Sequence, residues 1–189
     1  MDVPLRKLAQ HIREYGVIIT IIDSFVHIIR KMKKMYYQKK VGKKSVQAGT
    51  PLRVNYESNI NKKTHLGDNV NFNVMSIVGE GEVTIGDNFH SGTDCLIITQ
   101  NHNYDTGDAI PYDDTYIYKK VVIGDNVWLG SRVTILPGIT IEEGAIIQAG
   151  STVTSDIPKG AIAGGHPAKI FDRRNMDHYN KHKSEGNFH

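Results

Sequence analysis

The chain has 189 residues, of which 39% are hydrophobic and 23% charged, so it has the composition of one folded domain and not of a disordered or membrane-spanning protein. Its net charge of +3 is small for this length, which argues against a general nucleic-acid-binding protein. The single cysteine, Cys95, excludes an internal disulfide framework and a zinc site of four cysteines, and we expect it in the core.

Residues 1–50 are expected to form a helical N-terminal arm. Apolar residues from Ile18 to Tyr36 recur at alternating steps of four and three, the spacing of one helix face. The apolar run Val17–Ile29 is too short for a membrane-spanning helix, which needs about 20 apolar residues. No small-residue cleavage site follows it, which argues against a signal peptide.

A lysine-rich stretch follows between Arg30 and Lys44, and two interpretations of the arm remain open. In the first, the helix packs on the main domain or on a neighbouring subunit and its lysines face solvent. In the second, a basic amphipathic segment makes a peripheral contact with an anionic membrane surface. We expect a cytoplasmic protein, which in the second interpretation lies at the inner face of the membrane.

Residues 51–162 are expected to form a parallel β-helix of six-residue repeats. An aliphatic residue recurs every six positions from Ile123 to Val153, and a small or apolar residue recurs four positions later. A helix of 3.6 residues per turn does not produce this pattern, nor does the two-residue period of a strand, whereas hexapeptide repeats are typical of parallel β-helices. Three repeats close one triangular coil, and stacked coils bury the aliphatic residues.

The repeat is looser before residue 102 and stops at residues 103–120. From Ile60 to Val78 the six-residue step is kept, and Val78 is expected to point inward. Ile85 follows seven positions later, so we place a one-residue insertion near 79–82. Long loops inside a compact domain are usually functional or disordered. Four tyrosines in the excursion 103–120 favour an ordered loop that makes contacts.

The C-terminal tail is expected to comprise residues 163–189. The repeats end after Pro158, and the chain from Ala163 to Phe171 is expected to leave the prism. Residues 172–184 are polar and are expected to form a short terminal helix.

Several stretches of the repeat resemble the hexapeptide-repeat acyltransferases, and most of all the galactoside, maltose and capsule-polysaccharide O-acetyltransferases. The stretches are Gly-Asp-Asn-Val-Trp-Leu-Gly from Gly124, Leu-Pro-Gly-Ile-Thr-Ile from Leu136, Ala-Gly-Ser-Thr-Val-Thr-Ser-Asp-Ile-Pro from Ala149 and Gly-Gly-His-Pro-Ala-Lys-Ile from Gly164. The resemblance covers about residues 60–171. It implies a mainly β fold, a left-handed parallel β-helix shaped as a triangular prism, with an N-terminal helical arm and a short C-terminal helix. It also implies homotrimers with acetyl-CoA, the acyl donor, bound in a cleft between adjacent prisms.

His102 matches the catalytic histidine of this family, at the junction of the prism and the excursion. Acetyl transfer to a sugar hydroxyl needs a base, and the ordinary pKa of histidine, about 6.5, lets it accept and return a proton near neutral pH. Metal catalysis is not expected, because His65, His90 and His102 lack the five-residue histidine spacing of metal-dependent β-helical carbonic anhydrases.

The resemblance also implies residues that bind the acceptor and the donor. The acceptor residues it implies are Asn71, Asn73, Glu80 and Glu82, and the alternative for the two asparagines is that they are structural corner residues. The coenzyme A contacts it implies are Trp128, Ser131, Ala149, Thr154, Ser155 and Lys169. The backbone N–H of Ser131 would stabilise the charge that develops on the thioester oxygen. The alternative for Trp128 is a packing residue on the prism face.

The function expected from these residues is an acetyl-CoA-dependent O-acetyltransferase that acts on a sugar hydroxyl, in surface-polysaccharide biosynthesis, with a carbohydrate or another small hydroxyl compound as acceptor. The alternatives are a streptogramin-type xenobiotic acetyltransferase, a nucleotide-amino-sugar N-acetyltransferase and a non-enzymatic β-helical scaffold. Fold and donor are common to the enzymes, so neither distinguishes their acceptors.

Overall fold

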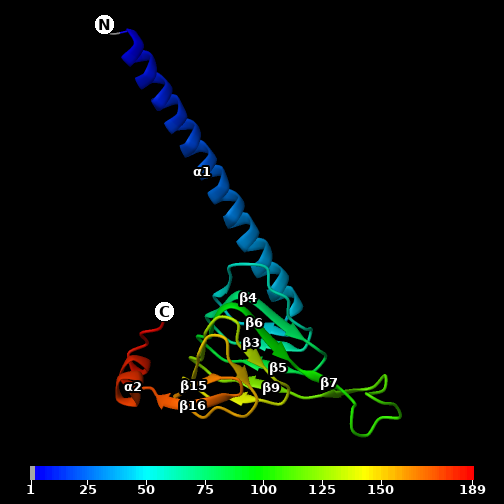
Figure 1. Ribbon diagram of the computed structural model, residues 1–189. Helices are drawn as coiled ribbons and strands as arrows, with labels where there is room; N and C mark the ends of the chain where they lie inside the picture. The colour runs from blue at the N-terminus through cyan, green and yellow to red at the C-terminus, as the bar shows by residue number, and fades with distance from the viewer. Residues whose placement is uncertain (1–2) are drawn as a thin grey trace.

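A computed structural model describes residues 3–189 and shows a parallel β-helix from which one long helix projects (Figure 1). Helix α1 spans Val3–Lys44 and helix α2 spans Met176–Ser184. The strands between them lie mostly parallel, in successive coils. The predicted parallel β-helix with an N-terminal helix and a short C-terminal helix is therefore confirmed.

The strands stack on three faces. The first face carries β1 (Gln47–Ala48), β3 (Thr64–Leu66), β5 (Val83–Ile85), β9 (Val121–Ile123) and β12 (Thr140–Ile141). A second sheet wraps over the other two faces, because β4 (Val70–Val78) and β6 (His90–Ile98) bend across a corner. The second face carries the beginnings of these strands with β2 (Leu52–Val54), β10 (Trp128–Leu129), β13 (Ile146–Ile147) and β15 (Ala161–Gly165). The third face carries their ends with β11 (Thr134–Ile135) and β14 (Thr152–Val153).

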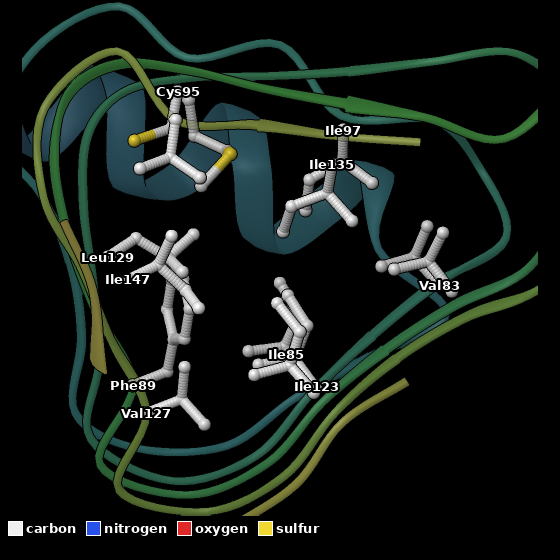
Figure 2. Packing of buried hydrophobic residues seen from close by; sticks show 14 of the residues in the cluster. Val83, Ile85, Phe89, Cys95, Ile97, Ile123, Val127, Leu129, Ile135 and Ile147 are labelled. Atoms are coloured by element: carbon white, nitrogen blue, oxygen red, sulfur yellow. The ribbon is translucent and has the colours of Figure 1, made fainter. Parts of the chain in front are cut away.

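The core is a set of side-chain columns that run through the stacked coils. The predicted aliphatic column from Ile123 to Val153 is confirmed, because each of its members is at most 1% exposed. Figure 2 shows side chains of equivalent positions lying over one another, as Leu129 does with Ile147. Cys95 is buried in this core as predicted, and burial raises the pKa of its thiol.

One inward position of the looser repeat was predicted wrongly. Val78 is 38% exposed, and Ile77 points inward at 2% exposure. The register between β4 and β6 shifts near Asn73, where the corner is shorter, so the chain is out of phase before it reaches 79–82. Two local changes of opposite sign, at 73–74 and at 79–82, produce the single net insertion that the sequence shows.

The corners between the first and second faces repeat the tripeptide Gly-Asp-Asn and stack in register. Each aspartate accepts a hydrogen bond from the backbone of the preceding coil, as Asp125 Oδ1 does from the N–H of Asp87 at 2.8 Å. The asparagines form a side-chain ladder in which Asn69 donates to Asn88 and Asn88 donates to Asn126. These three asparagines have φ between 53° and 58°, a left-handed conformation that asparagine tolerates. The repeat therefore supplies the turn and the bonds between coils together.

Helix α1 contacts the prism only through its last turns. Val41 is buried, and Gln38 Nε2 donates a hydrogen bond to the carbonyl of Leu52 at 2.9 Å. Farther from the prism, Ile18, Phe25 and their apolar neighbours are 37–64% exposed, so the prediction that this face packs on the chain's own main domain is wrong. Packing on another subunit remains a prediction. Within residues 3–189, no helix combines the length and the hydropathy that a membrane crossing requires.

The tail departs from the expected boundaries. Strand β15 still stacks on β13, so the prism continues through Ala163. Strand β16 (Ala168–Arg173) then returns antiparallel along β15. Helix α2 begins at Met176 and not at residue 172, because Asn175 is its N-cap and accepts a hydrogen bond from the N–H of His178.

Candidate functional site

His102 lies on a hairpin that projects from the prism on the side away from α2 (Figure 1). Strand β7 (Gln100–His102) pairs antiparallel with β8 (Tyr116–Tyr118), so the expected excursion is a paired stem with a tip at 103–115. The tip is ordered by its own polar side chains. Asp113 Oδ1 accepts from the N–H of Thr115 at 2.9 Å, and hydrogen bonds from Thr115 lower the pKa of the Asp113 carboxyl.

Two tyrosines of the hairpin fix the plane of the His102 ring. The ring stacks on Tyr112 with a centroid distance of 3.8 Å and lies 4.6 Å from the ring of Tyr116. Its Nδ1 atom is buried and has no hydrogen-bond partner among the described residues. Buried polar atoms usually have a partner, so an orphaned ring nitrogen indicates a site that something outside the single chain completes. The tyrosines of the loop are visible in the sequence, but no spacing indicates that two of them pack against the histidine.

Two edges of the prism flank its third face and carry most of the predicted site residues. The His102 edge joins the third face to the first and comprises residues 61–63, 79–82, 99–120, 136–139 and 154–157. The Ser131 edge joins the second face to the third and comprises residues 73–74, 93–94, 131–132 and 149–150.

Glu80 and Glu82 lie on the His102 edge, one coil before the hairpin. The backbone N–H of Glu80 donates to Gln100 Oε1 on β7 at 2.9 Å, while its carboxylate has no ion pair in the described chain. Glu82 forms an ion pair with Lys120 at 2.7 Å, and the hydrogen bond from Lys120 lowers the pKa of the Glu82 carboxyl. Of the two acids, Glu80 is the one whose carboxylate is free to meet a hydroxyl group.

Asn71 lies on the second face and Asn73 at the Ser131 edge, both away from the hairpin. Asn55 Nδ2 donates to the Oδ1 atoms of both, at 3.0 and 2.8 Å. Asn73 also donates from Nδ2 to the carbonyl of Ser91 at 2.7 Å, so both ends of its amide link coils. The structural alternative thus has direct support for Asn73, whereas the NH₂ group of Asn71 donates no hydrogen bond within residues 3–189.

The Ser131 edge presents backbone N–H groups. The side chain of Ser131 is bound to Thr93, with its Oγ accepting from the Thr93 N–H at 3.1 Å. In the described part of the chain, the backbone N–H groups of Ser131 and Ala149 have no hydrogen-bond acceptor. Gly92 allows this close stacking, because a Cβ there would lie 2.4 Å from the Ser131 nitrogen. Free N–H groups at an exposed edge are the donors that a developing oxyanion needs.

The other predicted donor contacts are dispersed. Thr154 and Ser155 are exposed on the His102 edge, and Lys169 is exposed on β16. Trp128 is 53% exposed on the second face, next to His90 in the neighbouring coil. It faces a cavity of about 570 Å³ between the prism and α2, so it is not a simple packing residue of the prism. One chain therefore holds the predicted base and the predicted oxyanion donor on opposite edges of its third face.

A charged cluster that the sequence did not reveal fixes α2 beside this cavity. Burial alone would raise the pKa of Glu143, but hydrogen bonds from Lys183, Tyr179 and Lys159 outweigh it and lower the pKa to about 2. Burial and the hydrogen bond to Glu143 raise the pKa of Tyr179 to about 12. The Tyr179 hydroxyl also accepts from Asn126 Nδ2 at 2.9 Å, so the asparagine ladder ends on α2.

Comparisons with known proteins point to one group. Residues 120–155 match the family described as bacterial transferase hexapeptide (six repeats). The chain is 37% identical over 140 residues to the galactoside O-acetyltransferase of Escherichia coli (strain K12). The aligned region covers 70% of this chain and 62% of that protein. Its structure is similar to a galactoside acetyltransferase in complex with coenzyme A, with a TM-score of 0.59, 30% identity and coverage of 73% of this chain and 70% of the other.

A maltose O-acetyltransferase from Clostridium difficile 630 is also similar, with a TM-score of 0.52, 30% identity and coverage of 68% and 67%. The chain spans about three fifths of the length of the curated relatives it matches. The similarity to these two structures covers 73% and 68% of the chain.

Proposed function

The chain belongs to the hexapeptide-repeat acyltransferases, and from this premise we propose that it transfers the acetyl group of acetyl-CoA to a hydroxyl group of a sugar. The observation that carries the proposal is His102, whose ring is fixed between Tyr112 and Tyr116 at an edge of the prism. A ring held in one orientation by packing presents its nitrogen atoms in fixed directions, which a general base requires. A non-enzymatic scaffold has no need of this arrangement.

In the proposed mechanism, His102 accepts the proton of the acceptor hydroxyl as the hydroxyl oxygen attacks the thioester carbonyl. The N–H of Ser131 donates to the carbonyl oxygen as negative charge develops on it. When the carbon–sulfur bond breaks, His102 returns the proton to the departing sulfur. The products are the acetylated sugar and the free thiol of coenzyme A, and no metal takes part.

The proposed catalytic unit is a homotrimer with His102 of one subunit facing the Ser131 edge of the next. The base and the oxyanion donor lie on opposite edges of one face, so a single chain does not bring them together. A pocket that encloses a ligand needs walls on more than one side, and a second prism supplies them. A ring of identical head-to-tail contacts closes with cyclic symmetry, and a triangular prism favours three copies.

The acceptor is proposed to bind beside His102, near Glu80. Among the residues predicted to bind the acceptor, the carboxylate of Glu80 and the NH₂ group of Asn71 are the polar groups without an ion pair or hydrogen bond to a described side chain. Within the trimer these two groups would come from neighbouring subunits. The sugar hydroxyl is assigned from the galactoside and maltose enzymes that the chain resembles, and surface-polysaccharide assembly is the setting we propose.

The arm is proposed to contact the inner surface of the membrane. Its apolar side chains from Ile18 to Ile29 are exposed, and the basic stretch Arg30–Lys44 follows directly. Between Ser24 and Tyr56 the chain has no acidic residue, so this surface is complementary to anionic lipids.

The test of the proposed function is a thiol-release assay with acetyl-CoA and a panel of acceptors. We expect release with a galactoside or maltose-type sugar and not with streptogramins. Amino-sugar nucleotides in the same panel distinguish O-acetylation from N-acetylation. Absence of thiol release with every sugar, from a folded trimer with acetyl-CoA bound, would contradict the proposal.

A further inference from the structure

A row of aromatic rings leads away from His102 along the prism. The ring of Tyr116, next to His102, lies 6.3 Å from the ring of Tyr118 on the same strand. The ammonium group of Lys63 lies over the Tyr118 ring at 5.9 Å from its centroid. Tyr116 and Tyr118 are 41% and 52% exposed, so part of each ring is accessible from solvent. Exposed aromatic faces offer apolar surface with a polar tip, which suits the C–H faces and hydroxyl groups of sugar rings.

A basic pocket lies between α1 and the prism. From the prism, Lys62 lines this pocket, and it is the neighbour of Lys63 in the sequence. From the last turns of α1, the pocket is lined by Tyr36 and by four lysines, Lys39, Lys40, Lys43 and Lys44. The pocket has a volume of about 710 Å³. It joins the helix, whose role the proposed mechanism leaves unexplained, to the edge that carries the base.

Three of the five lysines are free to bind a ligand. Lys40 pairs with Glu57 at 2.9 Å, and Lys44 donates to Asn59 at 2.8 Å, so these two hold the helix on the prism. Lys39, Lys43 and Lys62 have no ion pair or side-chain hydrogen bond with the side chains that the structure describes. Glu57 is the one acidic partner that a pocket lysine has there, and it is already engaged. Several unpaired ammonium groups at one pocket favour a multiply charged anion such as phosphate or diphosphate.

We propose that the acceptor is an oligosaccharide with a phosphate or diphosphate at its reducing end, the anion bound by the lysine pocket and the sugar rings laid along Tyr118 and Tyr116 toward His102. This inference rests on the proposed function and names its substrate class. Tyr116, Tyr118 and Lys63 follow His102 at successive distances of 4.6, 6.3 and 5.9 Å, so a ligand that extends along this row needs more than one sugar unit. The same chemistry is supplied by a soluble oligosaccharide phosphate or by an oligosaccharide on a lipid diphosphate.

The decisive experiment compares matched acceptors and matched variants in the full-length protein. The acceptors are galactotriose 1-phosphate, neutral methyl galactotrioside and galactose 1-phosphate, and the readout is kcat/KM for thiol release. The wild-type protein is expected to prefer the trisaccharide phosphate over the neutral trisaccharide by about tenfold or more. Lys62→Glu is expected to reduce this ratio to about one. Lys181→Glu, on an exposed lysine of α2 that has no ion pair in the described chain, changes the net charge equally and is expected to keep the ratio.

A second arm distinguishes the source of the anion. The same trisaccharide on a short polyprenyl diphosphate in phosphatidylcholine vesicles tests a lipid-linked acceptor against the soluble phosphate. Whichever acceptor is preferred, its advantage over the neutral trisaccharide must depend on Lys62. Equal use of charged and neutral trisaccharides, or a ratio that Lys62→Glu leaves intact, would overturn the proposal.

Equilibrium binding of inorganic pyrophosphate, measured by calorimetry, separates this inference from the proposed function. We expect binding that Lys62→Glu weakens about tenfold and Lys181→Glu does not. If pyrophosphate does not bind to the wild-type protein, the proposal that the lysine pocket binds an anion is wrong. Binding without acetyl transfer to any acceptor would instead overturn the proposed function, and with it the route to His102.

Discussion

Replacement of His102 by alanine tests the chemistry and the packing of the hairpin at once. The stem that carries His102 is paired through backbone bonds between β7 and β8, which do not depend on its side chain. We therefore expect His102→Ala to fold and assemble as the wild-type protein does. Loss of a general base typically lowers turnover by a factor of about 100 or more, and this is the decrease we expect in kcat.

The two tyrosines allow the size of the positioning effect to be estimated. An aromatic pair contributes about 0.5–1.5 kcal/mol beyond its buried area. Tyr112 makes the tighter stack on the His102 ring, at 3.8 Å, so Tyr112→Ala removes one such contact. The ring then spends less time in its working orientation, and kcat is expected to fall by about 2- to 10-fold with little change in KM. Tyr112→Phe keeps the stacked ring and is expected to be close to wild type.

The assay is thiol release at saturating acetyl-CoA, with circular dichroism and sedimentation to show that each variant is folded and assembled. Wild-type turnover in His102→Ala would remove this residue from the mechanism. A decrease in Tyr112→Phe as large as that in Tyr112→Ala would mean that the hydroxyl group matters and that the stacking argument is wrong.

Four further outcomes are expected. Sedimentation should give three times the chain mass of 21.1 kDa. An active monomer, or full activity after deletion of residues 106–114, would contradict a site formed between two subunits. Leu129→Ala should lower the free energy of unfolding by about 2–5 kcal/mol in urea titrations, because this fully buried side chain lies mid-column; a loss below 1 kcal/mol would contradict it. Gly86→Ala should reduce the melting temperature, because the new Cβ would lie 2.8 Å from the backbone nitrogen of Asp125; an unchanged melting temperature would show that the corner can relax. The folded-state pKa of Glu143 is about 2, below the usual value, so this carboxylate stabilises the docking of α2 above about pH 4.5 and loses that effect as the pH falls toward 2. The rate of amide hydrogen exchange in α2 should therefore rise between these pH values, and Glu143→Gln should remove this pH dependence.

The sequence predicted the prism well because its signal is local and repeated. From Ile123 to Val153 every inward residue was identified correctly, since each repeat reports the same geometry. The prediction failed at Val78, where two corner changes of opposite sign leave only their sum visible in the spacing. Periodicity measures the net phase of the chain and does not show where a corner shortens.

The site was less predictable, because it depends on contacts between segments far apart in sequence. The resemblance predicts His102 as the base, but it did not indicate that Tyr112 would stack on the ring, since the tip of the hairpin folds back through its own hydrogen bonds. The same holds for Glu143 and α2, which are brought together by the end of the asparagine ladder. The helical character of the arm was readable from its spacing, whereas its projection into solvent was not, because a helical period does not specify a partner.

The two ends of the prism are closed by different means, and this limits how such a protein can assemble. A stack of near-identical coils has no intrinsic length, and its last strands carry unpaired N–H and C=O groups that match the first strands of another copy. Here the end of α1 covers the first coil, with Gln38 bound to the carbonyl of Leu52, and β16 runs antiparallel where the next parallel strand would lie. On the second face, neither end therefore offers a free parallel strand on which another prism could continue. This hinders growth into a fibre along the prism axis and favours contacts between copies through the edges along its sides.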